Sequence, residues 1–207
     1  MTETPLHILK KYWGYSSFRP SQEEIINNVL ASKHTLALLP TGGGKSICYQ
    51  IPALLKEGIC IVISPLIALI QDQVAQLRNK NIKAIALSGK LSLQELDQRL
   101  DNCLYGNYKF LFLSPERLQN NLVQERIKQM NVSLIAIDEA HCISQWGHDF
   151  RPSYRQIIDL KKLQPQTPII ALTATATPEV VDDIIDTLEI KSANIYKNSF
   201  KRDNLHF

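Results

Sequence analysis

The sequence predicts an α/β domain with a mainly parallel central sheet and helices on both faces, because short apolar segments alternate with helical patterns along the chain. Continuous apolar character over a few residues is typical of parallel strands that are buried on both faces. Seven segments are strand candidates, and most of them have this character: residues 35–39, 59–64, 83–87, 109–114, 134–138, 169–173 and 194–199. The 207 residues suffice for one large domain or two small ones, and no repeat or linker divides them.

The composition is ordinary for a soluble globular protein, with 44% apolar and 21% charged residues. The net charge of +3 is too small to establish a polyanionic partner. No apolar run approaches the ~18 residues that span a bilayer, and the first residues lack the layout of a signal peptide. We therefore expect a cytoplasmic protein (bacterial cytosol or nucleoid, or the nucleus in a eukaryote) with no membrane partner.

Four cysteines, Cys48, Cys60, Cys103 and Cys142, form no Cys-x-x-Cys pair and show no spacing typical of metal ligands. Buried, reduced thiols are the favoured interpretation for a cytosolic protein. Neither a disulfide nor a metal centre is expected at these positions.

Helix signals begin near the N-terminus. Residues 6–13 predict a short helix that ends near Gly14. Ser21 followed by Glu24 predicts a capping box that opens a second helix, and residues 47–55 predict a third, mostly apolar one.

Three further helices are predicted between the later strands. Each has an apolar stripe at helical spacing. They are one around residues 70–77, one opened by a capping box of Ser92 and Glu95, and one in which Thr177 precedes Pro178 at the first helical position.

The segment 39–46 is a candidate phosphate-binding loop. It reads Leu-Pro-Thr-Gly-Gly-Gly-Lys-Ser and lies between the strand at 35–39 and the helix at 47–55. Glycines let several backbone N–H groups face one anion, and the helix N-terminus adds partial positive charge. Lys45 is expected to reach the β- and γ-phosphates of a nucleotide, and Ser46 to hold Mg²⁺. Leu39 departs from the usual pattern, where a glycine is expected, and a plain glycine-rich turn is the alternative.

An acidic pair follows another predicted strand. Asp138 and Glu139 come directly after the apolar residues 134–137. In an open α/β sheet, ligands bind outside the carboxyl ends of the strands, so Asp138 is expected beside the phosphate loop as a Mg²⁺ ligand. Glu139 is then placed to orient or deprotonate the attacking water. A solvated acidic strand end is the alternative, and it is disfavoured by the combination with Lys45 and Ser46.

Together these motifs resemble superfamily 2 helicases of the RecQ family. The resemblance rests on segments in the family's order: residues 15–22, 41–50, 64–74, 138–141, 142–152 and 173–175. It covers nearly the whole chain. It implies a RecA-like P-loop NTPase domain that binds ATP and Mg²⁺, with Lys45, Asp138 and Glu139 as catalytic residues.

The resemblance also implies roles for individual residues. Nucleotide contacts are expected from Tyr15, Arg19, Gln22, Thr41, Gly42, Gly43, Gly44, Lys45 and Ser46, the first three around the adenine. DNA binding and its coupling to ATP hydrolysis are expected from His141, Trp146, His148, Phe150, Arg151, Thr173 and Thr175. His141 is expected to couple the two sites and not to bind metal, because no second ligand lies at a suitable spacing. Ser64, Gln73 and Glu116 are expected along the DNA track. Without the resemblance, a surface tyrosine, a loop pinned by core aromatics and a strand with a hydroxyl cap would explain the same residues.

Family members are longer, with a second RecA-like domain and often zinc-binding, winged-helix and C-terminal modules. Residues 1–207 are therefore expected to be the first motor domain of a monomeric ATP-dependent DNA helicase that moves 3′ to 5′ on single-stranded DNA and unwinds duplexes in repair and recombination. An arginine from the second domain is worth ~10³–10⁵ in rate, so the domain alone should be nearly inactive. A nucleotide-dependent nucleic-acid-binding module is the alternative, and a small-molecule kinase is disfavoured by the motifs after Asp138.

Overall fold

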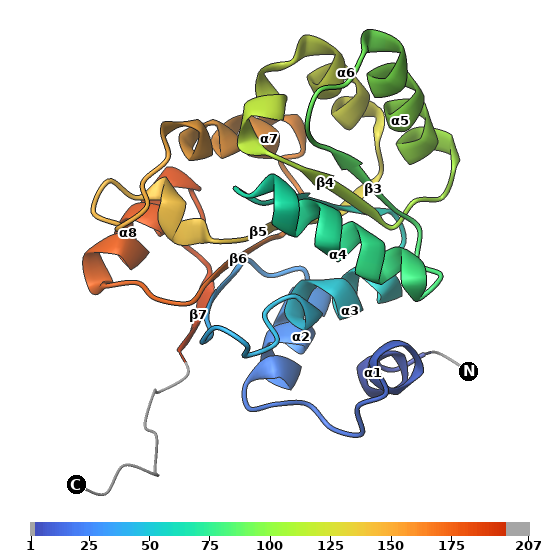
Figure 1. Ribbon diagram of the computed structural model, residues 1–207. Helices are drawn as coiled ribbons and strands as arrows, with labels where there is room; N and C mark the ends of the chain where they lie inside the picture. Colours follow the sequence, from blue (N-terminus) through green and yellow to red (C-terminus); the bar gives the residue numbers. More distant parts are fainter. Residues whose placement is uncertain (1–2, 198–207) are drawn as a thin grey trace, which may run out of the picture.

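Seven parallel strands form one sheet in the computed structural model, which describes residues 3–197 (Figure 1). The order across the sheet is β3-β4-β2-β5-β6-β1-β7, and every pairing is parallel. The strands are β1 (Thr35–Leu38), β2 (Ile59–Ile63), β3 (Ala84–Leu87), β4 (Phe110–Leu113), β5 (Val132–Ile137), β6 (Ile169–Thr173) and β7 (Asn194–Lys197). The predicted fold class is confirmed.

Helices cover both faces of the sheet because successive strand residues point to opposite sides. In β1, for example, Leu36 and Leu38 face one hydrophobic core, and Ala37 faces the other. The first core is closed by α5 (Leu93–Tyr105), α6 (Asn121–Gln129), α7 (Ile157–Leu163) and α8 (Pro178–Thr187). The second is closed by α2 (Gln22–Leu30), α3 (Ile47–Leu55) and α4 (Ile67–Asn79), and α1 (Pro5–Trp13) packs against α2 and α3.

Two of the predicted helix caps are confirmed. The Ser92 hydroxyl accepts from Glu95 N at 3.2 Å while Glu95 Oε2 accepts from Ser92 N at 2.8 Å, and Thr177 accepts from Val180 N at 3.4 Å. The capping box predicted at Ser21 is wrong. Ser21 has φ 67°, in the left-handed region, and its side chain makes no capping hydrogen bond to α2. An N-cap side chain reaches the helix from extended backbone, which Ser21 does not adopt.

Several elements were not predicted from the sequence. They are α6, α7 and three 3₁₀ helices, η1 (Pro115–Gln119), η2 (Ala140–Ile143) and η3 (Pro152–Gln156). β5 begins two residues before the predicted start, and the last two residues of the predicted strand 194–199 lie outside the described residues. All four cysteines are free and buried, as predicted. Within residues 3–197, no helix has both the length and the apolar character needed to cross a membrane.

Candidate nucleotide and nucleic-acid site

The predicted site residues gather at the carboxyl edge of the sheet. The phosphate loop follows β1, the acidic pair follows β5, and Thr173 ends β6. In the sheet, β6 lies between β1 and β5. Thr173 therefore stands between the two halves of the site.

The phosphate loop is braced from beneath by Gln22, which is only 2% exposed. Its Nε2 donates to the carbonyls of Gly43 (3.4 Å) and Gly44 (3.2 Å), while its Oε1 accepts from Arg19 N at 2.8 Å. Arg19 also donates a side-chain hydrogen bond to the carbonyl of Gly42. Gly44 has φ 74°, and a Cβ there would lie 2.3 Å from Gln22 Nε2. A residue with a side chain would be strained at this φ and would displace the Gln22 amide. The polar atoms of Gln22 are already engaged by protein groups.

A cavity of about 620 Å³ opens beside the loop. It brings together most of the residues that the sequence assigned to the nucleotide, with Tyr15 half exposed at its rim. Its lining is Trp13, Tyr15, Ser16, Ser17, Arg19, Gln22, Gly42, Gly44, Lys45, Ser46, Ile47, Leu69, Gln73, Gln76 and Asp138. Thr41 and Gly43 belong to the same loop but not to this lining. The cavity joins an aromatic and amide end to a phosphate-loop end, as an adenine nucleotide requires.

Glu139 joins the two halves of the site. Its Oε1 lies 3.1 Å from Lys45 Nζ, and its Oε2 lies 3.4 Å from His141 Nδ1. The backbone of Glu139 has φ 48° and ψ 47°, a left-handed conformation that costs energy for a residue with a side chain. This turn directs the carboxylate back toward the phosphate loop.

Asp138 is the more deeply buried carboxylate, at 8% exposure. Burial, and then the negative charge of Glu139, raise its pKa, whereas the nearby Lys45 lowers it. Glu139 N donates to Asp138 Oδ1 at 3.0 Å. A buried carboxylate and the hydroxyl of Ser46 line one cavity, and such hard oxygen ligands fit Mg²⁺.

Two buried tyrosines support this carboxylate. The hydroxyl of Tyr154 donates to the backbone oxygen of Asp138 at 3.0 Å. The hydroxyl of Tyr49 donates to Gln73, whose amide faces Asp138. Sequence reasoning missed Tyr49 and Tyr154 and placed Gln73 on the DNA track. No spacing signal identifies them, because they come from α3, η3 and α4 and meet Asp138 only in the folded chain.

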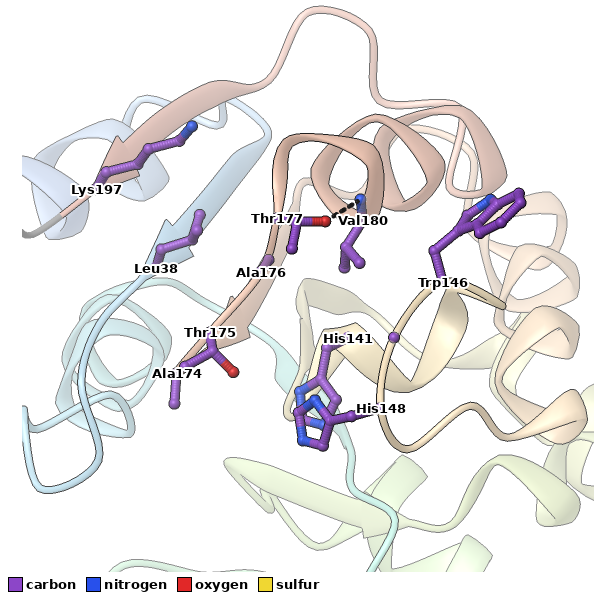
Figure 2. A pocket seen from close by; sticks show the side chains of 11 residues that line it. Leu38, His141, Trp146, His148, Ala174, Thr175, Ala176, Thr177, Val180 and Lys197 are labelled. Atoms are coloured by element: carbon purple, nitrogen blue, oxygen red, sulfur yellow. Dashed lines mark hydrogen bonds between the residues drawn. The ribbon is translucent and has the colours of Figure 1, made fainter.

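Figure 2 shows a second cavity, of about 520 Å³. It is lined by Leu38, His141, Trp146, Gly147, His148, Ala174, Thr175, Ala176, Thr177, Val180 and Lys197. The rings of His141 and His148 are stacked, with centroids 4.6 Å apart and planes at 13°. His141 Nδ1 lies 2.9 Å from Thr173 Oγ1, and burial lowers the pKa of His141. Trp146 is 76% exposed, so a large aromatic face is available to a partner.

The remaining predicted DNA residues lie outside this lining. Arg151 donates to the carbonyl of Pro65 at 3.2 Å and contacts Asp149 Oδ2 at 3.4 Å. The ring of Phe150 lies 5.6 Å from the guanidinium of Arg155. Within residues 145–151, Trp146 and His148 thus line the cavity, whereas Phe150 and Arg151 contact other residues of the domain.

The three residues expected along the DNA track do not share one surface. Ser64 is fully buried, and Gln73 lines the nucleotide cavity. Glu116 accepts a hydrogen bond from the hydroxyl of Ser153 at 2.8 Å. Of the three, only Glu116 lies outside the nucleotide cavity with a side chain that is not buried.

A parallel sheet with a glycine-rich phosphate loop after one strand and an acidic pair after another defines a P-loop nucleotide-binding domain. The sequence profile of the DEAD/DEAH box helicases matches residues 19–184, and the chain belongs to this family. The predicted resemblance to RecQ helicases is confirmed as well. The chain is 50% identical over 202 residues to the ATP-dependent DNA helicase RecQ of Bacillus subtilis, covering 97% of this chain and 34% of that protein.

Other relatives agree. The probable ATP-dependent DNA helicase RecS of Bacillus subtilis is 46% identical over 95% of this chain and 40% of its own length, and RecQ of Haemophilus influenzae is 47% identical over 99% and 33%. The chain thus spans 33–40% of the length of these relatives. The Hef helicase domain of Pyrococcus furiosus is a similar solved structure, with TM-score 0.67 and 27% identity over 90% of this chain and 39% of that one. A hypothetical ATP-dependent RNA helicase from Sulfolobus tokodaii, at 19% identity and TM-score 0.70 over 94% and 56%, shares the fold.

Proposed function

We propose that this chain is the first RecA-like motor domain of a longer ATP-dependent DNA helicase. In the whole protein, ATP hydrolysis drives 3′ to 5′ movement on single-stranded DNA and unwinding of duplexes during repair and recombination. The relatives are DNA helicases by name, and the chain spans only 33–40% of their length; both findings support this proposal. The second RecA-like domain of the same parent is the expected partner, in a monomer that works on cytosolic or nucleoid DNA.

The nucleotide cavity fits ATP with Mg²⁺. The bound ion would neutralise charge on the phosphates and hold them in line for transfer to water. Ser46 and Asp138 offer the oxygen ligands for it, and Lys45 with the loop N–H groups would bind the phosphates. Tyr15 and Arg19, which line the same cavity, would stack on the adenine. Glu139 would accept the proton of the attacking water at its carboxylate.

One observation carries the coupling between ATP and DNA. A continuous polar path runs from Lys45 to Glu139 (3.1 Å), from Glu139 to His141 (3.4 Å), and from His141 to Thr173 (2.9 Å). His141 then stacks on His148, in the segment that carries the exposed Trp146. A base that stacks on Trp146 would therefore act on the same segment that touches the general base.

The test is Mg·ATP turnover with and without single-stranded DNA, for this chain and for one extended through the second domain. We expect almost no turnover from the 207 residues and DNA-stimulated turnover from the longer chain, because the completing arginine lies outside. Equal turnover from both chains would overturn the divided active site. If the longer chain binds nucleotide and DNA but never hydrolyses ATP, the protein is a nucleotide-dependent binding module instead.

A further inference from the structure

Three potential metal ligands meet directly behind the acidic pair. One ligand atom each from His141, Cys142 and Asp149 lies within 4.8 Å of the other two. Cys142 Sγ is 3.8 Å from His141 Nε2 and 3.7 Å from Asp149 Oδ2. From the sequence, His141 had no second ligand at a suitable spacing. The chain supplies both others, because η2 turns Cys142 next to the histidine and the segment after it returns Asp149 to the same point.

The hydrogen bonds around His141 leave its Nε2 lone pair available. Thr173 donates its hydroxyl proton to the carbonyl of Thr175 at 3.1 Å, so its oxygen is an acceptor toward His141 Nδ1 at 2.9 Å. The proton of the neutral imidazole is therefore on Nδ1, where Glu139 Oε2 also lies at 3.4 Å. Metal-ligating histidines are oriented in this way, with one ring N–H held by an oxygen and the other nitrogen facing the ion.

We propose that His141, Cys142 and Asp149 bind one zinc-class divalent ion. Tetrahedral zinc places its ligands at ~2.0–2.3 Å from the metal, and three atoms within 4.8 Å of one another can share such a centre after small side-chain movements. Imidazole, thiolate and carboxylate together suit zinc, whereas an all-oxygen set suits Mg²⁺. Water completes the fourth position, on the side where Asp149 is half exposed.

Charge and protons balance. The metal–sulfur bond replaces the S–H bond of Cys142, and the thiol proton goes to solvent. One thiolate and one carboxylate then neutralise the two charges of the ion. Metal binding would have to replace one existing ion pair, because the guanidinium of Arg151 contacts Asp149 Oδ2 at 3.4 Å. Arg151 has a second acceptor in the carbonyl of Pro65, at 3.2 Å, to which it can remain bonded.

Bound metal would tie the segment that carries His148 and Trp146 to the turn that follows Glu139. This consequence goes beyond the proposed function and rests on it: if DNA acts through that segment, an occupied site suppresses DNA-stimulated turnover. The binding itself requires neither ATP nor DNA. Failure of the helicase proposal and failure of the metal site are therefore distinguishable.

The experiment is a cobalt titration of the reduced 207-residue chain in the absence of chelator. Co²⁺ stands in for zinc, and its bond to a thiolate gives a sulfur-to-metal charge-transfer absorption. We expect one equivalent to bind with this absorption and zinc to displace it. Cys142→Ser should abolish the absorption, whereas Cys103→Ser, at another buried cysteine in the core on α5, should keep it.

Asp149→Asn is the second variant, because Asp149 is half exposed and its change should not prevent folding. Loss of one ligand should weaken cobalt binding by about tenfold or more, since even outer-shell changes cost ~10–100-fold. The proposal is overturned if the wild-type chain shows no charge-transfer absorption. It is also overturned if that absorption survives in Cys142→Ser, or if a folded Asp149→Asn chain binds cobalt as tightly as the wild type.

Discussion

The ammonium Nζ of Lys45 lies 3.1 Å from Glu139 Oε1, although the two residues follow strands that β6 separates. The lysine expected to bind phosphate is thus held by the carboxylate expected to activate water. Nucleotide binding must compete with this ion pair, which is partly screened because the side chains are 16% and 26% exposed.

Glu139→Gln should separate binding from chemistry. Release of Lys45 should tighten nucleotide binding by at most about fivefold, because a partly exposed ion pair is worth ~0–1 kcal/mol. DNA-stimulated turnover of the longer chain, as proposed above, should fall ~10²–10⁴-fold if Glu139 is the general base. Binding of a fluorescent nucleotide and steady-state hydrolysis measure the two effects. Glu125→Gln, at an exposed ion pair on α6, is the matched control and should leave both unchanged. Unreduced turnover in Glu139→Gln would exclude Glu139 as the base.

Tyr154→Phe should weaken the fold and the site together. The fully buried hydroxyl donates to the backbone oxygen of Asp138 at 3.0 Å, so its removal deletes one buried hydrogen bond. The free energy of unfolding should fall by ~0.5–1.5 kcal/mol, measured by urea denaturation. Tyr105→Phe removes a hydroxyl from a side chain that is 78% exposed. It should change the free energy of unfolding by less than ~0.5 kcal/mol. Equal stability of Tyr154→Phe and the wild type would show that this hydrogen bond contributes nothing.

Gln22→Glu should damage the phosphate loop. The amide donates to two loop carbonyls, and a carboxylate in its place would set negative oxygens against them at 3.2–3.4 Å. Loss of a buried donor costs ~1–3 kcal/mol, so nucleotide affinity should fall by about tenfold or more. Gln98→Glu makes the same change on the exposed side of α5 and should bind nucleotide normally. Undiminished affinity in Gln22→Glu would mean that the brace is not needed for binding.

Features that depend on contiguous residues could be predicted from the sequence. The strands could be inferred because their apolar residues are consecutive. The phosphate loop could be inferred because its glycines and Lys45 directly follow one such strand. The box at Ser21 failed because local sequence does not show that the backbone there is left-handed. Helix α6 has only two fully buried apolar residues, Val123 and Ile127, so its stripe is weak in the sequence.

The site divides in the same way. Asp138 and Glu139 are recognisable in the sequence because they follow an apolar strand. The residues that hydrogen-bond to Asp138 are not recognisable in this way. Tyr154 and Gln73 reach Asp138 through tertiary packing, and the position of β6 between β5 and β1 is likewise set by pairing of distant segments. Pairings between distant segments need the folded chain, since no periodicity encodes them.

The edge strand β3 gives a prediction about association. Among the described strands, it pairs only with β4. Two arginines donate to carbonyls on its open side: Arg78 Nε to Ala84 O at 2.8 Å, and Arg99 Nη1 to Ala86 O at 2.6 Å. An unprotected edge is a template for pairing with another chain. The double variant Arg78→Ala with Arg99→Ala should therefore self-associate as concentration rises, measured by analytical ultracentrifugation.

A control must remove the same charge elsewhere. Lys10 and Lys128 are exposed on α1 and α6. Lys10→Ala with Lys128→Ala should stay dispersed at the same concentrations. Association of both double variants alike would attribute the effect to net charge and not to the strand edge.

Asp138→Asn should stabilise the fold while it harms the site, and the gain should depend on pH. Burial raises the pKa of Asp138 above 3.8, so the folded chain binds this proton more tightly than the unfolded chain. The ionised form therefore destabilises the fold at neutral pH, and that penalty disappears as pH falls through the raised pKa. Asparagine is neutral, and its side-chain oxygen can still accept from Glu139 N.

Urea unfolding at pH 7 should show Asp138→Asn to be more stable than the wild type, and the difference should shrink toward pH 4. Mg²⁺-dependent nucleotide binding should weaken in the same variant, because the proposed oxygen ligand loses its charge. Asp72→Asn, at an exposed position on α4, should change unfolding little at either pH. A stability difference that stays constant with pH would show that it does not arise from ionisation of Asp138, since a linked proton must change the balance between the folded and unfolded chain as it binds.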